Sequence, residues 1–196
     1  MGKLIMYSVD TETTSLDETK GDIIEISFIR TTDLSQKTWW IKPMNPENIE
    51  DEALRKNGAN KDDLLWKTAA GKEKYRLIDD VLPEIENWIA EDNSKIYDRL
   101  LSGHNIRFDA NFMKSVWKRA GCEDTYPFAK FGREVDTMGL ALFYDWIMEQ
   151  NNEKYNLIAC IKKFGLEQLK AHGAANDTKM AYNLLMHVAK QIKKEG

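Results

Sequence analysis

The chain has 196 residues, of which 28 are basic and 32 acidic, so its formal net charge is −4. This balance excludes a strong overall positive field that would draw the protein to nucleic acid, so any phosphate recognition has to be local or assisted by a metal. The length suits a single domain, 1–196, large enough to bury roughly 70% of the surface that its unfolded chain exposes.

Cysteine usage and the N-terminal sequence indicate the compartment. Cys122 and Cys160 have no CxxC partner and are typical of reduced, small hydrophobic residues. The N-terminal apolar run is too short for the core of a signal peptide and leads directly into Asp10. We therefore expect a cytoplasmic protein with no membrane partner.

Strand signals come first along the chain. The apolar run before Asp10 is typical of a central strand that is covered on both faces, and β-forming residues recur at 23–29 and 37–42. These three segments predict an antiparallel meander. The polar stretch 45–74, with scattered apolar residues, predicts one or two short helices.

Strands and helices alternate in the second half. Helical spacing of apolar residues predicts a helix over 79–91, with Pro83 tolerable only in its first turn. The remaining pattern predicts strands at 100–105 and 134–137, a helix through Ile147, and helices at 109–120, 157–164 and 177–193. This order is typical of an α/β fold with a mixed sheet. Trp88, Trp117 and Trp146 fall in predicted helices, and we expect them in the core.

Asp10 and Glu12 stand two residues apart at the end of the first strand. Side chains alternate faces along a strand, so both carboxylates point the same way, with Cα atoms roughly 6.5 Å apart. Converging carboxylates repel each other unless they are compensated, and a divalent metal with oxygen ligands is the usual compensation. The alternative is that the two residues simply open a polar loop.

Three further residues bear on this choice. Asp109 lies where a predicted strand gives way to a helix, and Asp177 opens the last predicted helix. Taken singly, each is typical of a helix cap or a partner of the helix dipole. His172 lies five residues before Asp177, and a lone histidine in a loop is usually a surface residue.

Together, these residues resemble the motifs of the DEDD exonuclease superfamily, in its histidine-bearing branch. That branch includes the proofreading subunits of bacterial replicative polymerases, oligoribonuclease, RNase T and the TREX exonucleases. The family motif DxET(T)GL matches Asp10, Glu12, Thr13, Thr14 and Leu16. The motif HNxxFD matches His104, Asn105, Phe108 and Asp109, and HxAxxD matches His172, Ala174 and Asp177. The other branch carries a tyrosine where this chain has Gly173.

The resemblance covers almost the whole chain and implies a ribonuclease H-like fold. Its sheet would be mixed and five-stranded, with the antiparallel meander first, parallel strands next, and helices on both sides. It also implies two Mg²⁺ ions, with Mn²⁺ as a workable substitute. Asp10 would bridge both ions, Glu12 and Asp177 would hold the first, and Asp109 would bind the second through water.

The resemblance assigns the remaining roles as well. His172 would be the general base, since a histidine can exchange a proton near neutral pH. The backbone around Thr11 and the side chains of Thr13 and Leu16 would receive the terminal nucleotide, with Leu16 wedged against its base. Ser15 replaces the usual glycine before Leu16, and it would be strained if that position required a positive φ.

The implied activity is 3′–5′ hydrolysis of single-stranded DNA or RNA to 5′-mononucleotides by a two-metal mechanism. An exoribonuclease of the oligoribonuclease or RNase T type is an alternative, because sugar choice depends on the pocket around the 2′ position. A non-catalytic module that binds nucleic acid or a DNA polymerase is another. It is disfavoured because all five acidic and histidine positions are present. A DxDxT phosphatase is disfavoured by the second acid, which is Glu12.

Overall fold

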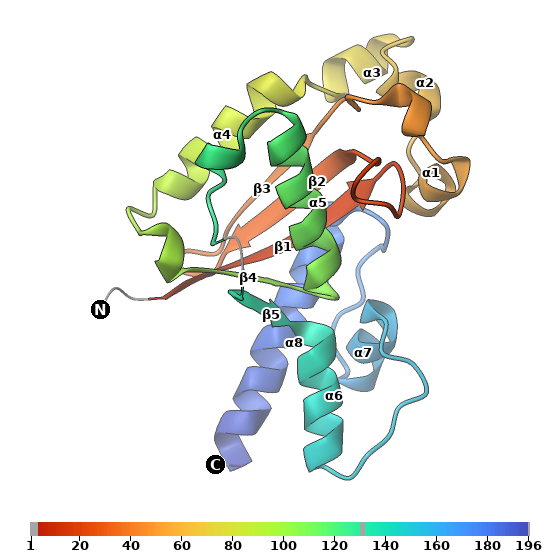
Figure 1. Ribbon diagram of the computed structural model, residues 1–196. Helices are drawn as coiled ribbons and strands as arrows, with labels where there is room; N and C mark the ends of the chain where they lie inside the picture. The colour runs from red at the N-terminus through yellow and green to blue at the C-terminus, as the bar shows by residue number, and fades with distance from the viewer. Residues whose placement is uncertain (1–3, 130–131, 196) are drawn as a thin grey trace.

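The computed structural model describes residues 4–129 and 132–195 (Figure 1). Its sheet has the strand order β3-β2-β1-β4-β5. The strands are β1 (Ile5–Thr13), β2 (Ile23–Arg30), β3 (Ser35–Trp40), β4 (Arg99–Gly103) and β5 (Glu134–Asp136). β1–β2 and β2–β3 are antiparallel, whereas β1–β4 and β4–β5 are parallel. The predicted mixed sheet, with the meander first, is confirmed.

Helices cover both faces of the sheet. The described helices are α1 (Asp51–Asn57), α2 (Lys61–Leu64), α3 (Ala69–Lys74), α4 (Ile78–Ala90), α5 (Ile106–Arg119), α6 (Thr137–Ile147), α7 (Leu157–Lys163) and α8 (Ala174–Glu195). Short 3₁₀ turns lie at Pro46–Asn48, Ile96–Asp98 and Glu123–Thr125. α4 and α5 pack on one face, and the N-terminal part of α8 packs across β1 and β2 on the other (Figure 1). α6, α7 and the rest of α8 extend beyond the sheet (Figure 1).

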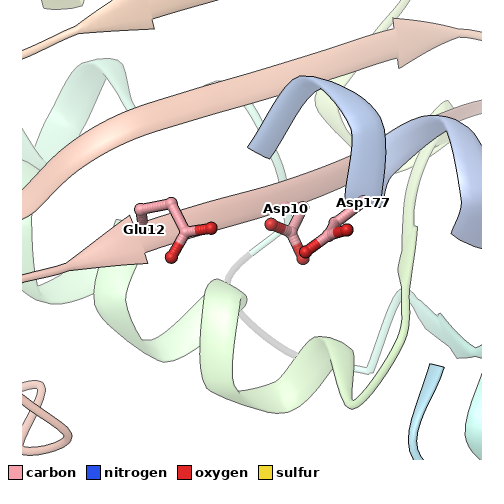
Figure 2. Close-up of side chains that lie close together, drawn as sticks. All are labelled: Asp10, Glu12 and Asp177. Carbon is pink, nitrogen blue, oxygen red and sulfur yellow. The ribbon is translucent and has the colours of Figure 1, made fainter. Parts of the chain in front are cut away.

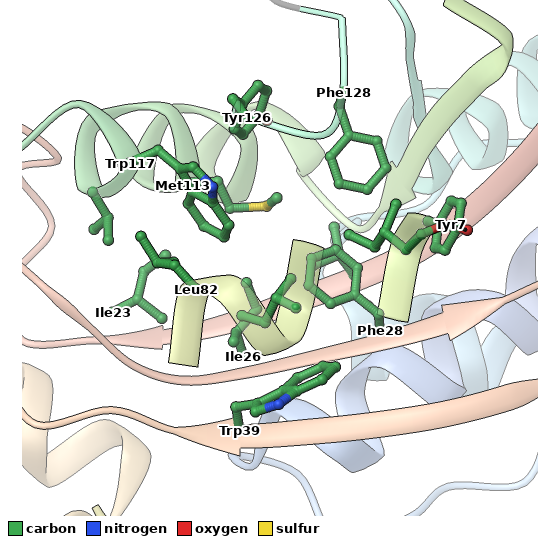
Figure 3. Packing of buried hydrophobic residues seen from close by; sticks show 14 of the residues in the cluster. Tyr7, Ile23, Ile26, Phe28, Trp39, Leu82, Met113, Trp117, Tyr126 and Phe128 are labelled. Carbon is green, nitrogen blue, oxygen red and sulfur yellow. Dashed lines mark hydrogen bonds between the residues drawn. The ribbon is translucent and has the colours of Figure 1, made fainter. Parts of the chain in front are cut away.

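The largest core lies between the sheet and the helices α4 and α5 (Figure 3). Tyr7 is fully buried, and its ring meets those of Trp88 and Phe128 edge-on, at centroid distances of 5.9 and 5.5 Å. Trp88 and Trp117 are 2% and 1% exposed, so their prediction as core residues is confirmed. Packing of this kind holds β1, which carries the acidic pair, rigidly in the middle of the sheet.

Trp146 was wrongly predicted to be buried, since it is 74% exposed at the end of α6. α6 has apolar residues on two sides. One side packs against α7 and α8, and the other faces outward with Leu142, Phe143 and Trp146. The helical spacing alone could not show which of two apolar sides is covered.

Several helix bounds differ from those predicted. α5 begins at Ile106 and α8 at Ala174, each three residues earlier than expected, so Asp109 and Asp177 lie inside the first turn. Pro83 is the sixth residue of α4 and lies beyond its first turn, where burial of the helix's apolar side outweighs one missing hydrogen bond. Residues 45–74 contain three short helices rather than one or two.

A search of the described helices finds none that is long and apolar enough to span a lipid bilayer.

β4 is packed so closely against β1 at Gly103 that a side chain has no room there. A Cβ at this position would lie 2.7 Å from the backbone oxygen of Val9 and 2.9 Å from Cδ1 of Ile106. We therefore expect Gly103→Ala to lower the free energy of unfolding by about 2 kcal/mol, measured by urea denaturation. The control is Gly139→Ala in α6, where the nearest atom would be 3.8 Å away and alanine should be neutral or stabilising. Equal stability of Gly103→Ala and the parent would show that the two strands can separate at little cost.

Candidate active site

The centre of the site is the end of β1, the middle strand of the sheet. Asp10 and Glu12 are both half-buried and lie on the face that α8 covers. Thr11, between them, points to the opposite face, where it contacts α5. The strand alternation expected from the sequence thus places the two carboxylates together.

α8 brings the third carboxylate, Asp177, to the pair (Figure 2). The start of this helix lies against the meander. The Thr178 hydroxyl, which donates to the backbone oxygen of Ala174 at 2.6 Å, is also 3.2 Å from the backbone oxygen of Ser27 in β2. The Gln36 side chain also donates to the backbone oxygen of Ala175 at 2.7 Å. In consequence, carboxylate oxygens of Asp10, Glu12 and Asp177 all lie within 4.8 Å of one another.

The two carboxylate oxygens of Asp177 differ in their hydrogen bonding. Its Oδ2 accepts a hydrogen bond from the backbone N–H of His172 at 3.2 Å. Its Oδ1 is buried and has no hydrogen-bond partner among the described residues. A buried polar atom without a partner costs about 1–3 kcal/mol, so it requires an explanation. A divalent cation fits, because all three residues offer the hard oxygen ligands that such ions prefer.

Mutual repulsion and burial shift the pKa values of the three carboxyl groups upward. Burial raises the pKa of Asp10 well above its usual value, and the charges of Asp109, Asp177 and Glu12 add to the effect. Burial, together with the charges of Asp177 and Glu25, raises the pKa of Glu12 to about 8. Burial likewise raises the pKa of Asp177. Each shift means that the charged form is poorly compensated by the protein itself.

Asp109, the fourth predicted ligand, lies outside this group of three. It is 3% exposed in the first turn of α5, and its Oδ1 accepts from both the backbone N–H and the hydroxyl of Thr11, at 2.9 and 2.8 Å. Burial raises the pKa of Asp109 to about 7, although the Thr11 hydrogen bonds act in the opposite direction. Asp109 is still near enough for its charge to act on Asp10.

His172 lies on the loop that precedes α8, with an exposed side chain. Its φ is +66°, a left-handed conformation that costs a residue with a Cβ about 1–2 kcal/mol. The backbone contact from its N–H to Asp177 accompanies this geometry. Strained backbone of this kind is often found at functional sites.

The three predicted substrate residues differ in exposure. Thr11 and Thr13 are buried, and both hydroxyls are already engaged, that of Thr13 with the backbone oxygen of Ser15 at 2.7 Å. Leu16 is 64% exposed. Ser15 is not among the residues with positive φ, so the anticipated strain is absent, and its hydroxyl donates to Glu50 at 2.7 Å.

His104 and Asn105, the first two residues of the second motif, are engaged in contacts within the protein. The two ring nitrogens of His104 lie 3.0 Å from the Thr137 hydroxyl and 2.7 Å from the backbone oxygen of Tyr155. Asn105 adopts a left-handed φ of +61°, and its N–H donates to Asp136 at 2.9 Å. These contacts fix the start of α5, and with it Asp109.

Two neighbours of the site were not singled out from the sequence. Glu25 lies directly opposite Glu12 in the β1–β2 register. Asn57, at the end of α1, donates its side-chain N–H to the backbone oxygen of Thr13 at 3.0 Å. Both line a pocket of about 120 Å³ beside Glu12, together with Asn60, Asp63 and Lys74. A glutamate within the apolar segment IIEISFI was the available signal for Glu25.

The raised pKa values predict how pH affects the stability of the metal-free protein. Glu12 and Asp109, with pKa values of about 8 and about 7, keep protons in the folded state that the unfolded chain has released. Because the folded state binds more protons, the free energy of unfolding falls as pH rises through this window. We expect the Tm in chelator to drop by at least about 3 °C between about pH 5 and pH 8, the shift that roughly 1 kcal/mol produces in a domain of this size.

Asp10→Asn removes one of the repelling groups and should flatten this pH dependence, as differential scanning fluorimetry would show. The matched control is Asp124→Asn, which changes an exposed aspartate outside the cluster. A parent protein whose stability rises over the same range would contradict the assignment.

Sequence comparisons show which known proteins this chain is similar to. The exonuclease family RNase_T matches residues 8–185 of the chain. The PolC-type DNA polymerase III of Bacillus cereus is 26% identical over 187 residues, which make up 95% of this chain and 11% of the polymerase. Its counterpart from Thermotoga maritima is 25% identical over 200 residues, or 100% of this chain and 12% of the polymerase.

Solved structures of exonuclease I share the fold. The zinc-bound complex of the Escherichia coli enzyme with single-stranded DNA has a TM-score of 0.77 at 15% identity, covering 97% of this chain and 41% of that one. Exonuclease I from Methylocaldum szegediense has a TM-score of 0.72 at 17% identity, covering 96% and 40%. The predicted ribonuclease H-like fold is thereby confirmed. Because the family match extends over residues 8–185, the chain belongs to the RNase_T exonuclease family, as its three motifs predict.

Proposed function

We propose that the protein is a metal-dependent 3′–5′ exonuclease that shortens single-stranded nucleic acid and releases 5′-mononucleotides. The observation that carries this proposal is the convergence of Asp10, Glu12 and Asp177, where one buried carboxylate oxygen of Asp177 has no hydrogen-bond partner in the part of the chain that the structure describes. Membership of an exonuclease family supports it. The chain spans only 11–12% of the polymerase relatives and 40–41% of the exonuclease I chains named above, so the activity of those whole proteins does not transfer by itself.

The acidic cluster and the family together indicate dependence on a divalent metal. We assign two Mg²⁺ ions to the acidic cluster, with Mn²⁺ as a substitute, because every ligand is a hard oxygen. Asp10 would contact both ions, Glu12 and Asp177 one of them, and Asp109 the other through water. When bound, such ions supply a water that loses its proton more easily and a positive charge beside the leaving oxygen.

His172 is the proposed general base. Its loop directly precedes α8, and its backbone N–H is bonded to Asp177, so its ring is tethered close to the carboxylate cluster. The ring itself is exposed and can approach a water molecule that lies over the cluster. In this arrangement the backbone of His172 positions a ligand, while the side chain is free to take the proton.

The loop after β1 is the proposed site for the 3′-terminal nucleotide. Exposed Leu16 would wedge against its base. The hydroxyls of Thr11 and Thr13 and the backbone N–H of Thr11 are engaged within the protein, so these two residues would contribute by holding Asp109 and the loop in place. The substrate class of single-stranded DNA is supported by the exonuclease I complex, and a DNA polymerase partner by the PolC-type relatives.

A time course on matched 5′-labelled single-stranded DNA and RNA tests the activity. With Mg²⁺ or Mn²⁺ we expect a ladder that shortens from the 3′ end, and with chelator we expect none. Asp10→Asn should abolish the ladder, because it removes the ligand shared by both ions, whereas Asp124→Asn should not. The ratio of the cleavage rates on DNA and on RNA gives the sugar preference. An intact substrate under every metal would refute the proposal.

The His172→Ala variant tests the general base independently of the metal ligands. We expect it to lower the rate by roughly 10²–10⁴-fold, the usual contribution of a general base. Metal affinity should persist, since Asp177 is contacted by the backbone of His172 and not by its ring. The control is His187→Ala in α8, whose ring packs against Phe164 at 5.3 Å and should affect stability alone. Parental turnover by His172→Ala would exclude the proposed role.

A further inference from the structure

Glu25 is a half-buried carboxylate that none of the assigned roles uses. It lies in β2, directly opposite Glu12 in the antiparallel register, and therefore on the same face of the sheet as Asp10 and Glu12. On its other side it pairs with Trp40 of β3. Among the residues that the structure describes, Glu25 forms no hydrogen bond or ion pair, so its charge is not neutralised by a direct partner.

The position of Glu25 lowers the stability of the metal-free protein. Like charges directly opposite each other on neighbouring strands destabilise a sheet, because their Cβ atoms are only about 4.5–5.5 Å apart. The charge of Glu25 acts against the ionised forms of Asp10, Glu12 and Asp177 alike. Lys74 lines the same pocket as Glu25, but its ammonium group lies over the rings of Trp40 and Tyr75, at 5.5 and 5.0 Å.

Glu25 is also not placed as a ligand. The group of carboxylate oxygens within 4.8 Å of one another consists of Asp10, Glu12 and Asp177, and Glu25 is not part of it. Any influence of Glu25 on a bound cation therefore acts through space and through Glu12. A negative charge near an ion site stabilises the occupied state and destabilises the empty one.

We propose that Glu25 is a positioning residue of the metal centre, whose charge opposite Glu12 raises the affinity of the three-carboxylate cluster for a divalent cation at the expense of stability in the metal-free protein. This inference rests on the metal dependence in the proposed function, but not on nuclease activity. It makes Glu25 a fifth carboxylate of the site, contributed by the strand next to the one that carries the motif.

Glu25→Gln removes the charge and keeps the shape. Mn²⁺ affinity, measured by electron paramagnetic resonance, should fall about tenfold, within the range known for groups behind metal ligands. The Tm without metal should rise, and the additional rise on adding Mn²⁺ should shrink. A higher Tm without metal combined with weaker Mn²⁺ binding distinguishes the proposed role from a purely structural one. A purely structural role would lower the Tm both with and without Mn²⁺.

Two variants control this comparison. Glu25→Asp keeps the charge and should bind Mn²⁺ within about threefold of the parent, since the carboxylate moves by one methylene. Glu84→Gln removes an exposed carboxylate that pairs with Arg76 far from the site, and it should leave Mn²⁺ affinity unchanged. An equal loss in Glu25→Asp and Glu25→Gln would overturn the proposal, because shape rather than charge would then matter.

The outcomes separate this inference from the proposed function. Parental Mn²⁺ affinity in Glu25→Gln, or a lower Tm both with and without metal, would overturn the role of Glu25 and leave the nuclease untouched. A parent protein that binds no Mn²⁺ would overturn both. A parent that binds Mn²⁺ with the predicted dependence on Glu25, but cleaves neither DNA nor RNA, would support the inference and refute the proposed activity.

Discussion

The repulsion between carboxylates held on one face of the sheet is the constraint on which the rest of the structure depends. Asp10 and Glu12 are fixed by the strand geometry, and Asp177 is fixed by the docking of α8 on β2 and β3. Without a compensating cation this arrangement costs folding free energy, which the aromatic core on the other face has to offset. The concentration of negative charge at β1 therefore lowers the folding stability of the protein.

Asp109, the fourth predicted ligand, is held differently from Asp10, Glu12 and Asp177. Asp109 approaches β1 from the α5 side, and two donors of Thr11 hold one of its oxygens. Its carboxylate is thus oriented by the strand that carries Asp10, although 98 residues separate Asp109 from Thr11 along the chain. Strands and helices hold the acidic groups, while Leu16 and His172 lie on loops with exposed side chains.

Much of this site could be predicted from local patterns. Strand alternation placed Asp10 and Glu12 together, and the motif order indicated Asp109, His172 and Asp177. Glu25 escaped notice because its relation to Glu12 depends on strand register, which no local pattern contains. The starts of α5 and α8 were missed because a residue with a positive φ, Asn105 or His172, comes shortly before each helix. The backbone N–H of Asn105 is bonded to Asp136, 31 residues away, and that of His172 to Asp177 in the first turn of α8. Trp146 was misplaced because an apolar helix side can be exposed.

The left-handed backbone of His172 has a consequence for substitutions that would stabilise this protein. Glycine adopts a positive φ without steric cost, so the substitution that relieves the strain at this position also removes the imidazole. Folding stability and the imidazole are therefore in direct opposition at a single residue. Engineering this loop for greater stability would therefore remove the side chain proposed as the general base.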